Sequence, residues 1–145
     1  MTPSLNASHE AIKEAEKALS IRLPEGLKAI WLVCNGLDYP HDWRIYPVFD
    51  RSMAKKCWGH MVEENRRSAY DYIQKDLIKI AGDSYGNHLV LKVTDGVAGE
   101  DIYVWNHETT ALRKSPITFA KIQAKAEQRI EGIKKKIARR MKKRR

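Results

Sequence analysis

The chain has 145 residues, a length that fits one globular domain, and a formal net charge of +9. With 43% hydrophobic and 31% charged residues, its composition excludes collagen-like and disordered polymers. Its longest apolar run, 29–34, is far shorter than the roughly 20 residues that a membrane helix needs. Two cysteines are too few for a disulfide scaffold, and no basic segment leads into an apolar one at the N-terminus, so we expect a cytoplasmic protein without a secretory signal.

Two amphipathic helices are expected in the first part of the chain. The first follows Ser8, whose side chain suits an N-cap, and the second starts at Pro24, which suits a first helical position. Asn35 and Gly36 end the second helix, because both tolerate a left-handed cap. Apolar residues at steps of three and four predict one buried face on each helix: Ile12, Ala15 and Leu19, then Leu27, Ile30, Trp31 and Cys34.

The middle of the chain predicts a strand and a less regular segment. Residues 37–42 are expected to form a loop and 43–49 a strand, which Pro47 places at an edge or a strand end. The segment 52–74 favours a helix broken near Gly59, because its polar residues do not alternate.

Three more strands, each with one face on the core, are expected to form a meander. Turn residues at 83–87 and 95–99 separate them. Alternating apolar residues such as Leu89 and Leu91 indicate strands with a single buried face. The expected strands are 77–81, 88–93 and 101–106.

One long helix is expected at the C-terminus. Ser115 followed by Pro116 predicts a helix start, and apolar residues then recur at steps of three and four as far as Met141. Residues 129–145 contain ten Lys or Arg and one acid, whereas 1–128 sum to zero charge. We therefore expect a neutral domain over 1–128 and a basic helical extension of the same domain over 129–145.

No set of residues has the spacing of a catalytic or metal site. Ser84 and Ser115 lie among turn residues, so we expect them to serve a turn and a cap. Cys57 and His60 have ligand-like spacing, but no second pair completes a four-ligand zinc site. Neighbouring carboxylates point apart along a helix or strand. We expect no enzyme activity, no catalytic residue, no metal and no cofactor.

Polar and aromatic residues in the expected loops and strand ends are the candidate partner-binding residues, because binding residues concentrate in loops and aromatics are frequent hot spots. The alternative is that the aromatics cover the open face of the sheet. We expect alanine at Trp43 or Tyr85 to weaken partner binding without lowering the melting temperature. The candidates are Tyr39, His41, Asp42, Trp43, Asp83, Tyr85, Asn87, His107 and Glu108.

The basic extension has three alternative roles. Its apolar stripe favours packing on the body or a homodimer through the C-terminal helix. Binding of nucleic acid or another polyanion ranks second, and would be independent of sequence and sensitive to salt. A membrane ranks third, because the stretch lacks Trp and Phe anchors. The candidate polyanion-binding residues are Lys134, Lys135, Lys136, Arg139, Arg140, Lys142, Lys143, Arg144 and Arg145.

Several short segments, in order and spacing, resemble one known family over roughly residues 11–126. They are IRLPE at 21–25, CNG at 34–36, IAGDSYGN at 80–87, IYVWNHE at 102–108 and a closing helix near Phe119. This order resembles the SUKH superfamily, which joins fungal cell-wall assembly regulators of the Smi/Knr type to bacterial immunity proteins of toxin systems.

The resemblance implies an α+β fold: a mainly antiparallel sheet of about four to six strands flanked by N-terminal and C-terminal helices. It also implies a non-enzymatic protein-binding module, an immunity protein that occludes a cognate toxin, often a nuclease. An inhibitor of a cationic nuclease is expected to be acidic, so the neutral body and basic tail argue against a nuclease partner. The alternative is a nucleic-acid-binding or regulatory scaffold protein that uses the basic C-terminal helix.

Overall fold

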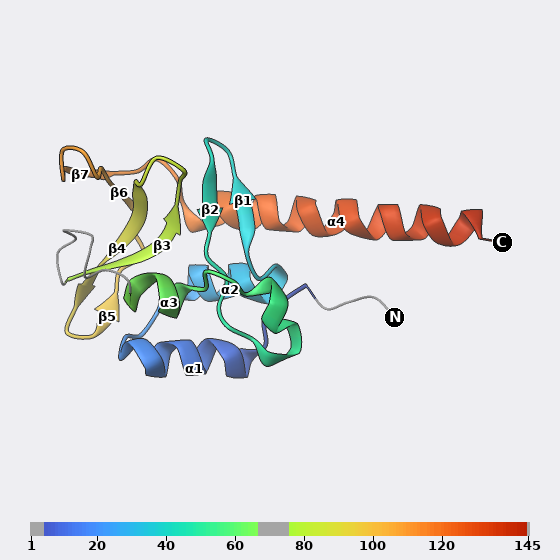
Figure 1. Ribbon diagram of the computed structural model, residues 1–145, viewed down its shortest axis with the longest axis horizontal. Coiled ribbons are helices and arrows are strands. Elements are labelled where there is room, and N and C mark those ends of the chain that lie inside the picture. The colour runs from blue at the N-terminus through green and yellow to red at the C-terminus, as the bar shows by residue number, and fades with distance from the viewer. Residues whose placement is uncertain (1–4, 67–75, 145) are drawn as a thin grey trace.

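The described residues, 5–66 and 76–144 of a computed structural model, form an antiparallel sheet with helices packed around it (Figure 1). The helices are α1 (His9–Leu19), α2 (Glu25–Val33), the 3-10 helix η1 (Arg51–Lys56), α3 (Met61–Arg66) and α4 (Phe119–Lys143). The strands are β1 (Leu37–Tyr39), β2 (Trp43–Ile45), β3 (Leu77–Gly82), β4 (His88–Thr94), β5 (Val97–Ala98), β6 (Tyr103–Trp105) and β7 (Leu112–Lys114). Their order is β1-β2-β3-β4-β6-β7, with β5 paired to β4. The predicted α+β class is confirmed.

The first two helices lie where the sequence predicts them. At the start of α1, the Ser8 Oγ accepts a hydrogen bond from the Ala11 amide at 3.1 Å, which is the expected N-cap. Pro24 is the N-cap of α2 rather than its first residue. The four apolar residues expected to form the stripe of α2 are all buried, and the chain turns after it through Gly36 at a φ of +97°.

The hairpin β1–β2 corrects two expectations. Residues 37–39, expected in a loop, form β1 and pair with β2 in the register Tyr39 to Trp43. The intervening turn holds His41 and Asp42 at positive φ (72° and 68°), without the glycine or asparagine that usually marks such a turn. β2 stops at Ile45, short of the expected 43–49, because Pro47 lacks an amide N–H to extend the ladder.

The meander is confirmed as the antiparallel neighbours β3, β4 and β6. Two short strands were not expected: β5 within the turn-like segment 95–99, and β7 after the third strand of the meander. β4 departs from the one-faced pattern, because Leu89, Val90 and Leu91 are all 0% exposed. Leu89 and Leu91 belong to the main core, whereas Val90 packs with Trp105 and a leucine on the other face.

One expected helix is broken where the sequence predicts it, and the start of another differs from expectation. The segment 52–74 contains η1 and α3, separated near Gly59 as predicted, while 67–74 lie outside the described residues. α4 begins at Phe119, where the family resemblance places the closing helix, but its N-cap is Thr118 rather than Ser115. The Ser115 Oγ instead accepts a hydrogen bond from the Ile117 amide at 3.0 Å and so forms a turn before the helix.

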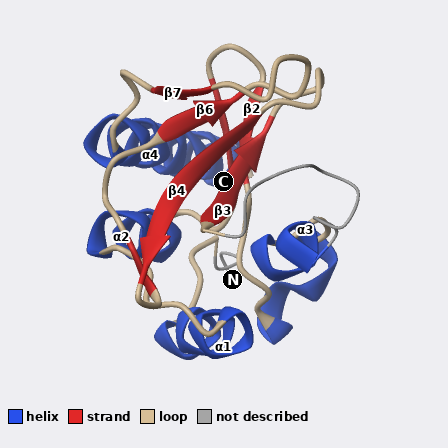
Figure 2. Ribbon diagram, turned by 90° about the vertical axis from the view of Figure 1, so that its left-hand side faces the viewer, coloured by secondary structure: helices blue, strands red, loops and turns tan. Residues whose placement is uncertain are grey.

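The helices form unequal layers on the sheet. α2 and α4 cover one face, α3 lies on the other side, and α1 closes the end of the molecule (Figure 2). Trp31 of α2 is 0% exposed in the main core, and its indole N–H donates to the Tyr46 carbonyl at 2.9 Å. Among the described residues, no helix is both long and apolar enough to span a bilayer.

Candidate partner-binding surface

Three hairpin turns lie together at one end of the sheet. Each turn is closed by one pair of strand residues: 40–42 by Tyr39–Trp43, 83–87 by Gly82–His88, and 106–111 by Trp105–Leu112. Neighbouring strands are in register there, since Arg44 pairs with Gly82 and His88 with Trp105. The pairing therefore gathers loops that are far apart in sequence (Figure 2). We call these three turns the turn surface.

Side-chain hydrogen bonds join the first two turns. The Asp42 carboxylate accepts hydrogen bonds from the Ser84 hydroxyl and, at 3.1 Å, from the Ser84 amide. These two bonds, the hydroxyl first, hold the pKa of Asp42 below its usual value of 3.8. Asp42 therefore carries a negative charge at neutral pH on the exposed surface.

A second set of hydrogen bonds shapes the turn 83–87 and joins it to 106–111. One oxygen of Asp83 accepts from the amides of Tyr85 (3.0 Å) and Asn87 (2.8 Å). The Asn87 side-chain oxygen in turn accepts from the His107 amide at 3.1 Å and lies 3.0 Å from the His107 ring nitrogen. Gly86, at a φ of +90°, lets the His107 ring approach closely. The three turns are thus held in one arrangement.

The structure brings eight of the nine candidate contact residues to this surface with side chains at least partly accessible. Tyr85 is 71% exposed, and His41, Asp42, His107 and Glu108 are exposed as well. The ninth, Trp43, is only 8% exposed within the main core. Alanine at Trp43 would leave a large cavity, so the expectation that this substitution spares stability is corrected. The partly buried candidates are Tyr39, Asp83 and Asn87.

A groove of about 490 Å³ runs beside the turn surface, between the two hairpins and the segment after η1. Its exposed wall is Trp58, 73% accessible, over which the Arg44 guanidinium lies at 5.7 Å from the ring centroid. Arg44 also donates a hydrogen bond to the Trp58 carbonyl. Sequence reasoning missed both residues, although a tryptophan directly before Gly59 in a segment without clear periodicity was a signal for an exposed aromatic.

The groove is acidic even though the chain as a whole is basic. Its lining includes four carboxylates against one guanidinium and one imidazole. Since the net charge of the chain comes from residues 129–145, it says nothing about the sign of this surface. The acidic residues of the groove are Asp38, Asp42, Glu64 and Asp83, and the basic ones are Arg44 and His88.

Ser84 has the spacing of a nucleophile elbow but not its structure. It lies between Gly82 and Gly86, and a G-x-S-x-G elbow requires a turn from a strand into a helix. Here the segment connects the antiparallel strands β3 and β4, and the serine hydroxyl donates to Asp42. Within 5–66 and 76–144, no three His, Cys, Asp or Glu side chains gather as metal ligands.

The two cysteines are buried and their thiols are not activated. Burial raises the pKa of the Cys57 thiol, which lies near the Asp50 and Met53 carbonyls. The pKa of Cys34 is likewise raised by burial. Both thiols are free and remain protonated at neutral pH, which is the reverse of what a nucleophile or metal ligand requires.

Residues 6–121 match the SMI1 / KNR4 family (SUKH-1). The chain belongs to this family. The SMI1/KNR4 match confirms the resemblance predicted from the sequence, and it supports a protein-binding role of the immunity type, since members are generally non-catalytic immunity or regulator proteins. It spans α1 to the first turn of α4, so the basic part of that helix lies beyond the matched SMI1/KNR4 region. No curated protein matches the chain.

Proposed function

We propose that this protein is a non-enzymatic immunity protein of the cytoplasm, which binds a cognate toxin through the turn surface and the adjoining acidic groove. Binding there would cover the active site of the toxin, a stoichiometric block that needs no chemistry from this chain. The observation that carries the proposal is the acidic, aromatic groove beside three hydrogen-bonded turns.

The charge of the groove favours a partner with a cationic face, such as a nuclease. The neutral sum of residues 1–128 argued against that partner, but charge acts locally within about a Debye length of 10 Å. Four carboxylates along one groove would steer a cationic toxin toward it and accelerate association. The local charge therefore supports a nuclease as the toxin.

The aromatic side chains supply the anchors that an interface needs. Trp58 and Tyr85 are the largest exposed aromatics in the described residues, and both lie at this end of the molecule. Aromatic residues carry much of the binding energy at protein interfaces. The turn that presents Tyr85 is held by hydrogen bonds to Asp83, and the Trp58 carbonyl accepts a hydrogen bond from Arg44. Both anchors are therefore positioned before any partner arrives, which lowers the entropy cost of binding.

The test measures binding of the purified protein to the toxin encoded beside its gene, by calorimetry and by inhibition of toxin activity. Trp58→Ala should weaken binding about 30-fold or more, the effect of losing an interface anchor. Phe49→Ala, which removes a 40% exposed aromatic from a different groove, is the matched control and should bind as the wild type does. Equal affinity of both variants would contradict the proposal.

A second pair of variants tests the charge. Asp38→Asn removes an exposed carboxylate from the groove, and Glu100→Gln removes an exposed carboxylate elsewhere. The first should slow association at low salt and the second should not. Turnover of any substrate by the purified protein alone would also overturn the proposal.

A further inference from the structure

The C-terminal helix belongs to the core only at its beginning. Phe119, Ile122 and Ala126 are buried, and Ile130 packs on the edge of the main core. Beyond that point α4 continues as one uninterrupted helix and projects from the body (Figure 1). We call residues 131–144 the arm; at 1.5 Å per residue they extend for about 21 Å.

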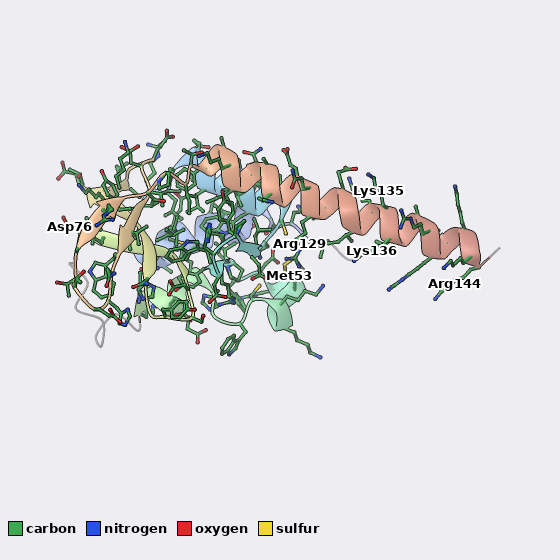
Figure 3. All side chains as sticks on the ribbon, turned by 90° about the horizontal axis from the view of Figure 1, so that it is seen from above. Met53, Asp76, Arg129, Lys135, Lys136 and Arg144 are labelled. Carbon is green, nitrogen blue, oxygen red and sulfur yellow. The ribbon has the colours of Figure 1, made fainter. Side chains whose placement is uncertain are left out.

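Almost every charged side chain of the arm is positive. Residues 131–144 include eight Lys or Arg and one acid, Glu131, whose carboxylate lies 3.9 Å from the Lys134 ammonium. Lys135 and Lys136 leave opposite edges of the helix in Figure 3, so the charge is not confined to one side. The positive side chains of the arm repel one another, and binding to a polyanion would relieve this repulsion.

Apolar and cationic side chains occupy different sides of the arm. Each residue turns an α-helix by about 100°, so Ile133 and Ile137 continue the line of Ile122 and Ala126, which faces the body. The opposite side, which faces away from the body, carries three cations together with Ala138 and, at the base of the arm, Glu131. Cations also occupy both flanks. Lys135, Arg139 and Lys142 are on the outward side, and Lys134, Lys136 and Lys143 are on the flanks.

This geometry discriminates among three occupants. A lipid bilayer would have to take up the apolar stripe, but the stripe is on the side of the body, and a flat surface pressed against it would meet the body first. A second copy paired along the stripe would bring two strongly cationic helices together. A DNA groove meets a helix on its outward side and both flanks at once, where this arm presents its charges.

We propose that the arm binds the sugar–phosphate backbone of duplex DNA without sequence preference, with its outward side in the major groove. An α-helix of 10–12 Å diameter fits a groove about 12 Å wide. The six outward and flanking cations can contact phosphates on both walls, while the body stays outside the groove. No aromatic side chain stands within the arm to stack on bases, so backbone contact is its mode of binding.

The experiment measures binding of the full chain to a fluorescent mixed-sequence duplex of about 20 base pairs, by anisotropy over a range of salt concentrations. The affinity should fall steeply with salt, and the sequence of the duplex should not matter. The triple variant that carries Lys135→Gln, Arg139→Gln and Lys142→Gln should bind about tenfold or more weakly. Its plot of log affinity against log salt concentration should have a slope shallower by about two to three.

The matched control removes three exposed lysines from the body: Lys13→Gln, Lys17→Gln and Lys55→Gln. It has the same net charge as the arm variant, so an equal loss of affinity would show a general charge effect and overturn the proposal. Ile133→Gln with Ile137→Gln should leave DNA binding intact, because the stripe faces away from the groove. Loss of binding in that variant would overturn the orientation.

Two competing ligands complete the test. Vesicles rich in anionic phospholipid, or a duplex of RNA, should bind more weakly than duplex DNA, since the RNA major groove is too narrow for a helix. Preference for either would overturn the proposal, as would concentration-dependent self-association that the arm variant abolishes. Toxin binding at the turn surface is measured separately, so failure of one proposal leaves the other standing.

Discussion

The Asp42 carboxylate accepts hydrogen bonds from both the hydroxyl and the amide of Ser84, which joins two hairpin turns 42 residues apart in sequence. Because these bonds stabilise the ionised form, the pKa of Asp42 lies below 3.8. Ser84→Ala removes the hydroxyl and keeps the amide, so it should raise the pKa of Asp42 toward that value. Carboxyl carbon NMR over a pH titration measures this; an unchanged pKa would show that the bond does not form in solution.

The Asn35 side chain is expected to be essential for stability. Its amide donates to the Val48 carbonyl and accepts from the Val48 amide, both at 2.9 Å, as a neighbouring strand would. Asn35→Ala leaves two buried backbone groups without partners and should lower the free energy of unfolding by about 2–4 kcal/mol. Urea denaturation gives this value, and a loss below about 0.5 kcal/mol would contradict it.

Two glycines should respond oppositely to alanine. A Cβ at Gly26 of α2 would lie 2.8 Å from the Phe119 Cβ of α4, so Gly26→Ala should destabilise by about 1–3 kcal/mol despite its better helix propensity. At Gly132 a Cβ would meet nothing within 4 Å, so Gly132→Ala should strengthen the arm by up to about 1 kcal/mol. Thermal unfolding and helical circular dichroism test the pair. Stabilisation by Gly26→Ala would refute the close approach, and destabilisation by Gly132→Ala would refute the open space at that position.

Asp50 should make stability depend on pH in the acid range. Its carboxylate accepts from the Ser52 hydroxyl at 2.7 Å and from the Ser8 amide at 3.0 Å, and these bonds keep its pKa below 3.8. A lowered folded-state pKa stabilises the fold above the unfolded-state pKa and loses that effect as the pH falls through the folded-state value.

Asp50→Asn should therefore cost about 1–2 kcal/mol at pH 7 and progressively less below pH 3.8. The measurement is the free energy of unfolding of both proteins from pH 7 to pH 2.5. A difference that stays constant over this range would rule out the carboxylate as its source.

Two aromatic residues of the predicted site should separate stability from binding. Trp43→Ala removes a core side chain and should cost about 3–5 kcal/mol. Tyr85→Ala removes one that is 71% exposed and should change stability by less than about 0.5 kcal/mol while weakening toxin binding. Calorimetric unfolding of both variants checks the contrast; equal melting temperatures would place Trp43 outside the core.

Local periodicity was enough to predict most of the fold, and non-local pairing explains what it missed. The stripe of α2 and the short apolar runs of β3 and β4 depend on residues a few positions apart, so the sequence shows them directly. β1, β5 and β7 are two or three residues long and exist because a neighbouring strand pairs with them. Short strands carry too little alternation for a single sequence to reveal them.

The candidate site follows the same rule. Turn chemistry identified Asp42, Asp83 and Tyr85 as loop residues, but which turns meet is set by the register of the sheet. Trp43 was assigned to a surface because the pairing that turns it into the core was not visible. Trp58 was missed for the same reason, since only the fold shows that its side chain is exposed and that Arg44 lies over its ring.

The continuity of α4 makes its last turns a built-in spacer. Because the helix is anchored in the core at Phe119 and has no break before Lys143, a dye or resin attached near Arg144 would be held clear of the body and away from the three turns. Immobilisation through this end should therefore present the acidic groove unobstructed, whereas attachment through a body lysine would mask it in a share of the molecules.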